Sequence, residues 1–317
     1  MSTAVNRSII YYNNNNPDTL AISVGVSFRK EFFMNNLKKV GIVACSNGLL
    51  TSSKEYVENL TEILKELFLE PIFSEYIYAE NSVFQGSGEE RANALMNFYR
   101  DNEISAIFDI SGGDIANETL LYVDFDVIKN SDKKFWGYSD LTTIINAVYT
   151  KTGKTSILYQ VRKLVECEER INDFKETFLN EKRDLFDFPY KFINGSSMSG
   201  IIVGGNIRCF LKLAGTEYFP ELSGKILLLE SLGGGVLQMT TFLSQLKMLG
   251  AFEKISGIIL GTFTKLEETA GEDAIITLIK RFAGDIPIAK THFIGHGSDS
   301  YAVEIGKYYS FVDKCNI

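Results

Sequence analysis

One serine stands where an apolar strand is predicted to turn into a helix. Ser139 is at the tip of the small-residue turn in 135–142, and helical apolar spacing from Leu141 to Val148 predicts a helix that ends at Gly153. A serine in such a turn exposes its hydroxyl, while the first amides of the helix could stabilise an oxyanion beside it. Ser139 is therefore a candidate nucleophile, and a serine that merely caps the helix is the alternative.

A nucleophilic serine needs a general base, and the chain contains two histidines. His296 lies between Gly295 and Gly297 just after a predicted strand, where an imidazole can project into a cleft. His292 falls inside the predicted strand 286–293, and we expect it to be a packing or surface residue. His296 is the better candidate base, with a loop histidine of no catalytic role as the alternative.

The base in turn needs an orienting carboxylate. Glu230 closes the strongly apolar strand 225–230. A carboxylate at the end of a buried strand is costly unless it is paired, so we predict that Glu230 orients His296. The alternative is an acid at a helix N-terminus beside the turn Gly233–Gly235. With Ser139 in one domain and its partners in another, the site would lie in the cleft between them.

Three glycine clusters lie near the predicted cleft. Gly113, in the pair Gly112–Gly113 after a predicted strand, could donate its amide to an oxyanion hole together with the amide of Asp140. Gly233–Gly235 could instead surround a phosphate, but no GxGxxG or P-loop sequence accompanies it, which disfavours a nucleotide cofactor. Gly204–Asn206 is expected to form a tight turn.

The composition argues against several classes of partner. The chain carries 32 Lys and Arg against 40 Asp and Glu, a formal charge of -8, with no basic stripe for nucleic acid. Its four cysteines are widely spaced, which argues against a zinc site or a disulfide framework. No apolar run reaches the roughly 18 residues that a membrane helix needs, and no signal-peptide pattern begins the chain. We therefore expect a cytoplasmic protein without a membrane partner.

The 317 residues predict two domains and an extension. Residues 1–33 are expected to be a peripheral N-terminal extension, with Met34 as the natural start of the domain. Residues 34–160 alternate strands and helices, which predicts a doubly wound parallel sheet that carries the nucleophile. Ligands bind such sheets beyond the carboxyl ends of the strands, where Gly112–Gly113 and Ser139 both lie. The expected strands are 39–45, 72–78 and 106–110. A first helix is expected to begin at a Ser52–Glu55 capping box and to be ended by Pro71, and two further helices are expected to begin at residues 89 and 116.

The second half of the chain is expected to start with a connector. Residues 161–198 are charged, aromatic and poorly periodic, which predicts a lid-like loop. Residues 199–317 predict a mixed, β-rich α/β domain that carries Glu230 and His296. Its expected strands are 199–203, 225–230, 257–263 and 286–293, with a final pair within 301–312, and its expected helices are 236–249 and 273–282.

A set of short motifs in a fixed order resembles the LD-carboxypeptidase family of serine peptidases, which includes the microcin-C immunity peptidases. These motifs are Val40–Ala44 with Ser46–Gly48, Ser111–Gly113, Gly137–Asp140, Gly204–Asn206, Leu213–Thr216, Leu228–Glu230 and Ile294–Gly297. The resemblance covers nearly everything from Met34 onwards. It implies a Ser-Glu-His triad at Ser139, Glu230 and His296, an oxyanion hole from the amides of Gly113 and Asp140, and commonly a homodimer. It implies neither a metal nor an organic cofactor.

The resemblance leaves the substrate open. Ser46–Gly48 and the long segment before Ser199 look closer to the immunity-peptidase branch, which implies cleavage of a peptidyl or aminoacyl-nucleotide amide. In that branch loop tryptophans stack on the base, whereas the single tryptophan here is Trp136, so phenylalanines of the connector are the candidate substitutes: Phe174, Phe178, Phe186 and Phe188. The alternatives are a murein tetrapeptide carboxypeptidase of cell-wall recycling and a two-domain binding module without catalysis.

Overall fold

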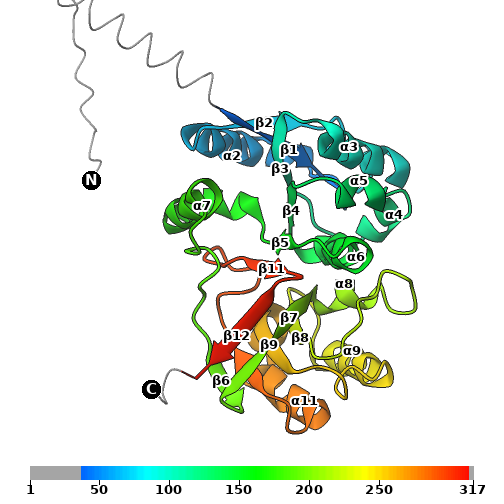
Figure 1. Cartoon of the computed structure of the whole chain (residues 1–317), viewed down its shortest axis with the longest axis vertical. Coiled ribbons are helices and arrows are strands. Elements are labelled where there is room, and N and C mark those ends of the chain that lie inside the picture. The colour runs from blue at the N-terminus through cyan, green and yellow to red at the C-terminus, as the bar shows by residue number, and fades with distance from the viewer. Residues whose placement is uncertain (1–36, 314–317) are drawn as a thin grey trace, which may run out of the picture.

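The computed structural model describes residues 37–313, which form two six-stranded sheets (Figure 1). The first sheet has the order β11-β5-β4-β3-β1-β2. Its strands are parallel except β11, which pairs antiparallel with β5. The strands are β1 (Lys38–Val43), β2 (Leu69–Phe73), β3 (Ile104–Asp109), β4 (Lys134–Gly137), β5 (Ser156–Leu158) and β11 (Val303–Ile305).

Helices cover both faces of the first sheet, as expected of a doubly wound domain. One face carries α2 (Lys54–Glu66) and α7 (Glu168–Asn180), and the other carries the remaining helices of this half (Figure 1). These are α3 (Gly88–Arg100), α4 (Ala116–Leu120), α5 (Phe125–Lys129) and α6 (Thr142–Thr152). Short 3-10 helices are η1 (Thr51–Ser53), η2 (Ser139–Leu141) and η3 (Val161–Val165).

The second sheet has the order β12-β7-β8-β9-β10-β6, with parallel strands at its centre and antiparallel ones at both edges. The strands are β6 (Lys191–Asn194), β7 (Ser197–Asn206), β8 (Ile226–Ser231), β9 (Gly257–Phe263), β10 (Ile288–Lys290) and β12 (Tyr308–Val312). The helices are α8 (Ile207–Leu211), α9 (Val236–Met248), α10 (Thr264–Ala270) and α11 (Ala274–Ala283). The predicted class, a doubly wound parallel domain followed by a mixed α/β domain, is confirmed.

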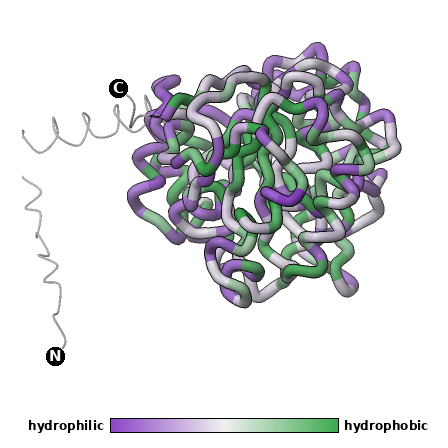
Figure 2. The backbone as a smooth tube through the Cα atoms, turned by 90° about the horizontal axis from the view of Figure 1, so that it is seen from below, coloured by the Kyte–Doolittle hydropathy of each residue, from purple (hydrophilic) through white to green (hydrophobic). Residues whose placement is uncertain are grey.

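Apolar side chains fill the space between the layers. Buried clusters lie on both faces of the first sheet and between the second sheet and α9 and α11. Hydrophobic residues accordingly concentrate in the middle of the molecule and hydrophilic ones at its margin (Figure 2). In residues 37–313, no helix is both long and apolar enough to span a bilayer. The expected extension 1–33 and start at Met34 lie outside the described residues.

Two expectations for the first domain are wrong in detail. The helix α2 has Ser53 as its N-cap and no side-chain capping bond, so Ser52–Glu55 is not a capping box. Pro71 lies inside β2 rather than ending a helix, because α2 has already ended at Glu66. β2 is the edge strand of its sheet, where a residue without an N–H is tolerated.

The segment 161–198, expected as a lid-like loop, contains regular structure. It holds η3, the three-turn helix α7 and strand β6, which joins the second sheet. The rings of Phe174 and Phe178 pack edge-on against Trp136, under the first sheet. Phe174 is fully buried, so its candidate role in stacking on a substrate base is wrong, and Phe178 is partly buried beside it.

Two further expectations concern the second half. Gly204–Asn206 forms the end of β7 and not a turn. A Cβ at Gly204 would lie 2.2 Å from the Leu228 carbonyl oxygen, so glycine here permits close strand approach. The two strands within 301–312 do not pair with each other, since β11 joins the first sheet and β12 the second. The consecutive strands β11 and β12 therefore connect the first sheet to the second.

Candidate active site

Ser139 lies at the junction of β4 and η2 with a left-handed backbone, φ +57°. Such a conformation costs a non-glycine residue of the order of 1–3 kcal/mol and is concentrated at functional sites. Ser139 is partly exposed, whereas its neighbours Tyr138 and Asp140 are buried. The N-caps are Tyr138 for η2 and Leu141 for α6, so the alternative of Ser139 as a helix cap is wrong.

Glu230 is fully buried near the end of β8. It lies opposite Asn206 in the register of β7 and β8, and the Asn206 amide Nδ2 donates to Glu230 Oε1 at 2.9 Å. No acidic residue occupies the first turn of α9, so Glu230 is not the helix N-terminal acid that was the alternative. A fully buried carboxylate needs such partners because its desolvation is costly.

His296 supplies the second partner of that carboxylate. Its Nδ1 lies 2.9 Å from Glu230 Oε2, and the imidazole side chain is 16% exposed. The ring of Tyr138, the residue before Ser139, meets the imidazole edge-on with centroids 5.1 Å apart. His292 is exposed and follows β10 rather than lying within it, which confirms a surface residue but corrects its predicted strand position.

Strand β9 holds the loop that carries His296. The Thr262 amide donates to the Ile294 carbonyl at 2.8 Å. A Cβ at Gly295 would lie 1.7 Å from Thr262 Oγ1, so this position has room for glycine alone. Ser300 Oγ donates a hydrogen bond to the Gly295 carbonyl oxygen at 2.8 Å. The backbone just before His296 is therefore fixed against β9.

Helix α6 of the first domain and β7 of the second bring the two halves of the site together. The Asn206 backbone N–H donates to Oγ1 of Thr142, which lies three residues after Ser139, at 3.1 Å. The Asn146 side chain donates to the Gly204 carbonyl and accepts from the Gly204 amide, both at 2.9 Å. Asn206 thus contacts Glu230 through its side chain and the start of α6 through its backbone.

Ser139 opens onto a cavity of about 350 Å³ at the contact of the two domains. Glu230 and His296 are not among its wall residues. The wall does include Asn206, which lies opposite Glu230 on the neighbouring strand, and Ser231, which follows Glu230 in the sequence. The wall also includes the glycine turn that precedes α9. The lining residues are Gly113, Asp114, Ser139, Asn206, Arg208, Ser231, Leu232, Gly233, Gly234, Gln238 and Phe242.

The predicted oxyanion donors are both close to Ser139, since Gly113 lines the same cavity and Asp140 is the next residue. A Cβ on Gly112 would come within 3.9 Å of the Ser139 Cβ, and Gly113 has φ +127°. The side chain of Asp140 points away into the protein, where it accepts from Ser46 Oγ at 2.7 Å and from the Ala116 amide at 2.8 Å. Asp140 therefore anchors the turn through its carboxylate.

Two cationic side chains of the second domain reach across to this turn and to the neighbouring Gly113 loop. Lys212 Nζ lies 2.5 Å from Asp140 Oδ1 and donates to the Asp114 carbonyl at 2.7 Å. Arg208 Nη2 donates to the Gly113 carbonyl at 2.9 Å. The buried negative charge of Asp140 is thereby balanced by a charge from the other domain.

Tyr138 is also part of the site's electrostatics. Burial first, and then the negative charge of Glu230, raise the pKa of the Tyr138 phenol well above its ordinary value. Tyr138 therefore stays neutral across the physiological range. Its ring forms an apolar wall beside the imidazole of His296.

Sequence reasoning missed Asn206, Lys212 and Tyr138. Asn206 carried the same signal as Glu230, a polar side chain that closes an apolar strand, but its glycine neighbours suggested a turn. Lys212 and Tyr138 gave no signal, because their roles depend on contacts between distant segments. Within residues 37–313, no group of three or more His, Cys, Asp or Glu could hold a metal, and the cysteines Cys45, Cys167 and Cys209 are free.

Both halves of the chain resemble domains of known proteins. The chain matches the LD-carboxypeptidase N-terminal domain over residues 40–159 and the LD-carboxypeptidase C-terminal domain over residues 199–310. A probable murein peptide carboxypeptidase of Bacillus subtilis is 26% identical over 288 residues, which cover 86% of this chain and 88% of that protein.

Two solved structures share the fold. MccF in complex with glutamyl sulfamoyl guanosine aligns with a TM-score of 0.79 and 20% identity, over 88% of this chain and 94% of its own. The muramoyltetrapeptide carboxypeptidase from Oxalobacter formigenes aligns with a TM-score of 0.72 and 21% identity, over 87% and 95%. Both domains and their order are shared, and the chain therefore belongs to the LD-carboxypeptidase family of serine peptidases.

Proposed function

We propose that the protein hydrolyses an amide bond near the carboxyl end of a small peptide or peptide conjugate, with Ser139 as nucleophile, His296 as general base and Glu230 as orienting carboxylate. The observation that carries this proposal is the 2.9 Å approach of His296 Nδ1 to buried Glu230 Oε2. That contact places Nδ1 beside the carboxylate, and Nε2, which has no hydrogen-bond partner among the described residues, is left for the serine, as the logic of a serine triad requires. The strained backbone of Ser139 at the cavity wall supports it.

The reaction then follows two acyl-transfer steps. His296 Nε2 removes the proton of Ser139 as the hydroxyl oxygen attacks the substrate carbonyl carbon. The amides of Gly113 and Asp140 would stabilise the oxyanion. His296 returns the proton to the leaving amine as the carbon–nitrogen bond breaks. Water, deprotonated by His296, then attacks the acyl-enzyme and releases the acid and Ser139.

For the substrate we propose a peptidyl or aminoacyl-nucleotide amide of the microcin-C type. The cavity wall contains the glycine turn at the N-terminus of α9, and a Cβ at Gly233 or Gly235 would meet no atom within 4 Å. The free amides of a helix N-terminus favour an anionic group such as a phosphate or a carboxylate. MccF, whose fold this chain shares, is seen in complex with an aminoacyl sulfamoyl nucleoside.

A murein tetrapeptide is the second candidate substrate. It is favoured by the relative that aligns over 86% of this chain and is named a probable murein peptide carboxypeptidase. Such a substrate also presents a terminal carboxylate that the same helix N-terminus could bind. In either case we propose a homodimer of this chain in the cytoplasm.

Parallel turnover assays separate the two candidates. The wild-type protein is incubated with an LD-linked muropeptide and with an aspartyl-adenylate mimic that contains a cleavable amide, with Ser139→Ala as the control. We expect kcat/KM for the nucleotide conjugate to exceed that for the muropeptide. The reverse order would assign the murein substrate. Equal product from wild type and Ser139→Ala would contradict hydrolysis by this site, and sedimentation of the same sample tests the homodimer.

A further inference from the structure

The loop after β3 has its peptide planes fixed from outside the loop. The Asn47 amide donates to the Gly112 carbonyl oxygen at 3.1 Å. No peptide of the described chain is cis, so the Gly113 N–H points opposite to that carbonyl. The bond from Asn47 therefore turns the Gly113 N–H away from the Asn47 backbone, while Gly113 itself lines the cavity with Ser139.

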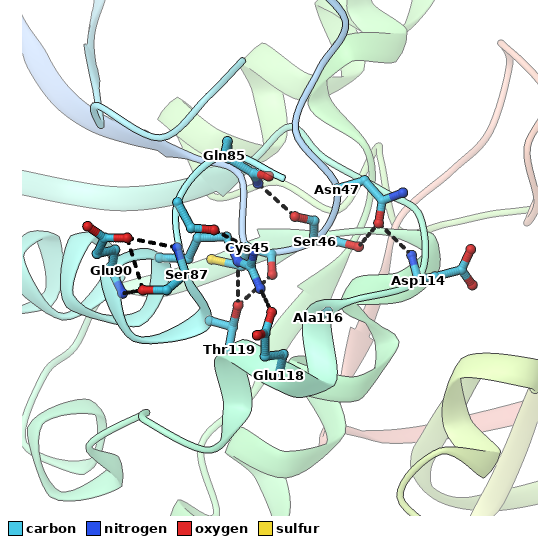
Figure 3. Close-up of polar contacts among 12 residues, drawn as sticks. Cys45, Ser46, Asn47, Gln85, Ser87, Glu90, Asp114, Ala116, Glu118 and Thr119 are labelled. Atoms are coloured by element: carbon cyan, nitrogen blue, oxygen red, sulfur yellow. Dashed lines mark hydrogen bonds and ion pairs between the residues drawn. The ribbon is translucent and has the colours of Figure 1, made fainter. Parts of the chain in front are cut away.

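The next peptide plane is held at both of its ends. The Gly113 carbonyl accepts from Arg208 Nη2 at 2.9 Å. The Asp114 amide, on the opposite side of the same plane, donates to Asn47 Oδ1 at 2.8 Å, and the Asn47 side chain is seen to point at Asp114 (Figure 3). Two consecutive planes are thus set, one by the Asn47 backbone and one by its side chain with Arg208.

Gly113 between these planes is also confined sterically. A Cβ built on Gly113 would lie 2.2 Å from Asn47 Cγ and 2.3 Å from Asn47 Oδ1, so the Asn47 side chain occupies the place of a Gly113 side chain. With φ at +127°, the Gly113 backbone is in a region that L-residues avoid. Contact with Asn47 therefore selects one orientation in a segment that glycine would otherwise leave free.

The loop that carries Asn47 is itself firmly held. Buried Asp109 accepts from the Cys45 amide at 2.7 Å and from the Ser111 amide at 2.7 Å, which ties the Asn47 loop to the Gly113 loop at their bases. Gln85 Nε2 donates to the Ser46 carbonyl at 2.7 Å, and Figure 3 shows the Gln85 side chain pointing at Ser46. Asn47 thus extends from a rigid base and can impose its geometry on Gly113.

We propose that Asn47 is a positioning residue that aims the Gly113 N–H at the oxyanion of the reaction, with Arg208 of the second domain helping to hold the next peptide plane, between Gly113 and Asp114. The inference rests on the proposed function, because the oxyanion exists only if Ser139 attacks a carbonyl. It assigns to Asn47 a part in kcat rather than in substrate affinity, since the oxyanion forms only after binding.

Two substitutions separate the acceptor of Asn47 from its volume. Asn47→Leu keeps a side chain of similar size without the oxygen, and Asn47→Asp keeps an acceptor for the Asp114 amide. For Asn47→Leu we expect kcat to fall between about 10-fold and 1000-fold, the upper figure being the loss of a whole oxyanion donor, with KM changed by less than about 3-fold. Asn47→Asp should retain more of the wild-type kcat.

A second readout does not need turnover. Hydrogen–deuterium exchange of the segment 112–116, followed by mass spectrometry, should be faster in Asn47→Leu than in wild type and near wild type in Asn47→Asp. Asn194→Ala is the matched control, because it removes a partly buried asparagine whose Nδ2 donates to the Ile286 carbonyl at 2.9 Å in the other domain. Its kcat and its exchange in this segment should equal those of wild type.

The outcomes distinguish this inference from the proposed function. If wild type turns over substrate and Asn47→Leu keeps its kcat within about twofold, the inference is overturned and the proposed function stands. If wild type hydrolyses none of the substrates, the proposed function fails. Exchange alone then decides the inference: faster exchange of 112–116 in Asn47→Leu supports the positioning, and wild-type exchange overturns it.

Discussion

The buried ion pair between the domains allows a stringent test of what holds the site together. Lys212 Nζ lies 2.5 Å from Asp140 Oδ1, with side-chain exposures of 19% and 0%. Lys212→Met keeps the aliphatic stem but leaves the carboxylate buried without its counter-charge. Removing one partner of such a pair costs about 3–5 kcal/mol. Because hydrogen bonds from Ser46 and Ala116 remain, we expect the lower end, about 3 kcal/mol.

Urea unfolding measures this loss. The single tryptophan, Trp136, lies in β4 of the first domain, so its fluorescence reports the domain that holds Asp140. The control is Lys151→Met, which removes an ion pair with Glu217 that also connects the two halves but has side chains 32% and 68% exposed. Exposed pairs contribute about 0–1 kcal/mol, so this control should change the unfolding free energy by less than 1 kcal/mol.

A double-variant cycle checks the physical cause. In Lys212→Met with Asp140→Asn, the buried charge is gone and the amide oxygen still accepts hydrogen bonds. The double variant should therefore be more stable than Lys212→Met alone, with a coupling of roughly 2 kcal/mol. Unfolding of Lys212→Met at the same urea concentration as Lys151→Met, or additive effects of Lys212→Met and Asp140→Asn, would refute a stabilising role of the buried ion pair.

Three further predictions concern acid stability, the His296 loop and thiol reactivity. Burial alone would raise the pKa of Glu304, but hydrogen bonds from Lys134, Lys307 and Thr155 outweigh it and lower the pKa from 4.5 to about 2, so the group stabilises the fold above pH 4.5. Up to about 3 kcal/mol should be lost as pH falls from 4.5 to about 2, and acid titration of Glu304→Gln, monitored by circular dichroism, should lack this component. Gly295→Ala places a Cβ 1.7 Å from Thr262 Oγ1 and should lower kcat about 100-fold, with partial recovery in the double variant with Thr262→Ala; full activity of Gly295→Ala would contradict the account of the loop. Burial raises the pKa of the Cys45 and Cys209 thiols, so iodoacetamide at pH 8 should leave both unlabelled in the folded protein while partly exposed Cys167 reacts, as peptide mapping would show.

Much of the fold could be predicted because its signals are local. The parallel strands at the sheet centres, β1, β3, β8 and β9, are continuous apolar runs, and α6 ends at Gly153 with φ +72° as its sequence indicates. Helix α7 was missed although Phe174 and Phe178 lie at helical spacing, because its many charged residues hid a narrow apolar face. Pro71 was misjudged because an edge strand tolerates proline, and the edge position depends on the whole sheet.

The candidate site divides in the same way. Ser139 and Glu230 stand at the ends of apolar strands and His296 between two glycines, so residue type and position were enough to select them. Asn47, Asn206 and Lys212 act through contacts between segments far apart in the chain. The roles of Asn206 and Lys212 follow from the packing of α6 and α8 against β7, and that of Asn47 from the contact between the loops after β1 and β3, none of which a local pattern encodes.

The central claim is that Ser139 forms the acyl-enzyme. It is tested most directly by the kcat of Ser139→Ala on the substrate that wild type cleaves best, with the intact fold verified by circular dichroism. We expect a fall of several orders of magnitude, as in other serine triads, and an acyl adduct on Ser139 in rapidly quenched wild type. A Ser139→Ala variant that folds and keeps the wild-type kcat would contradict it.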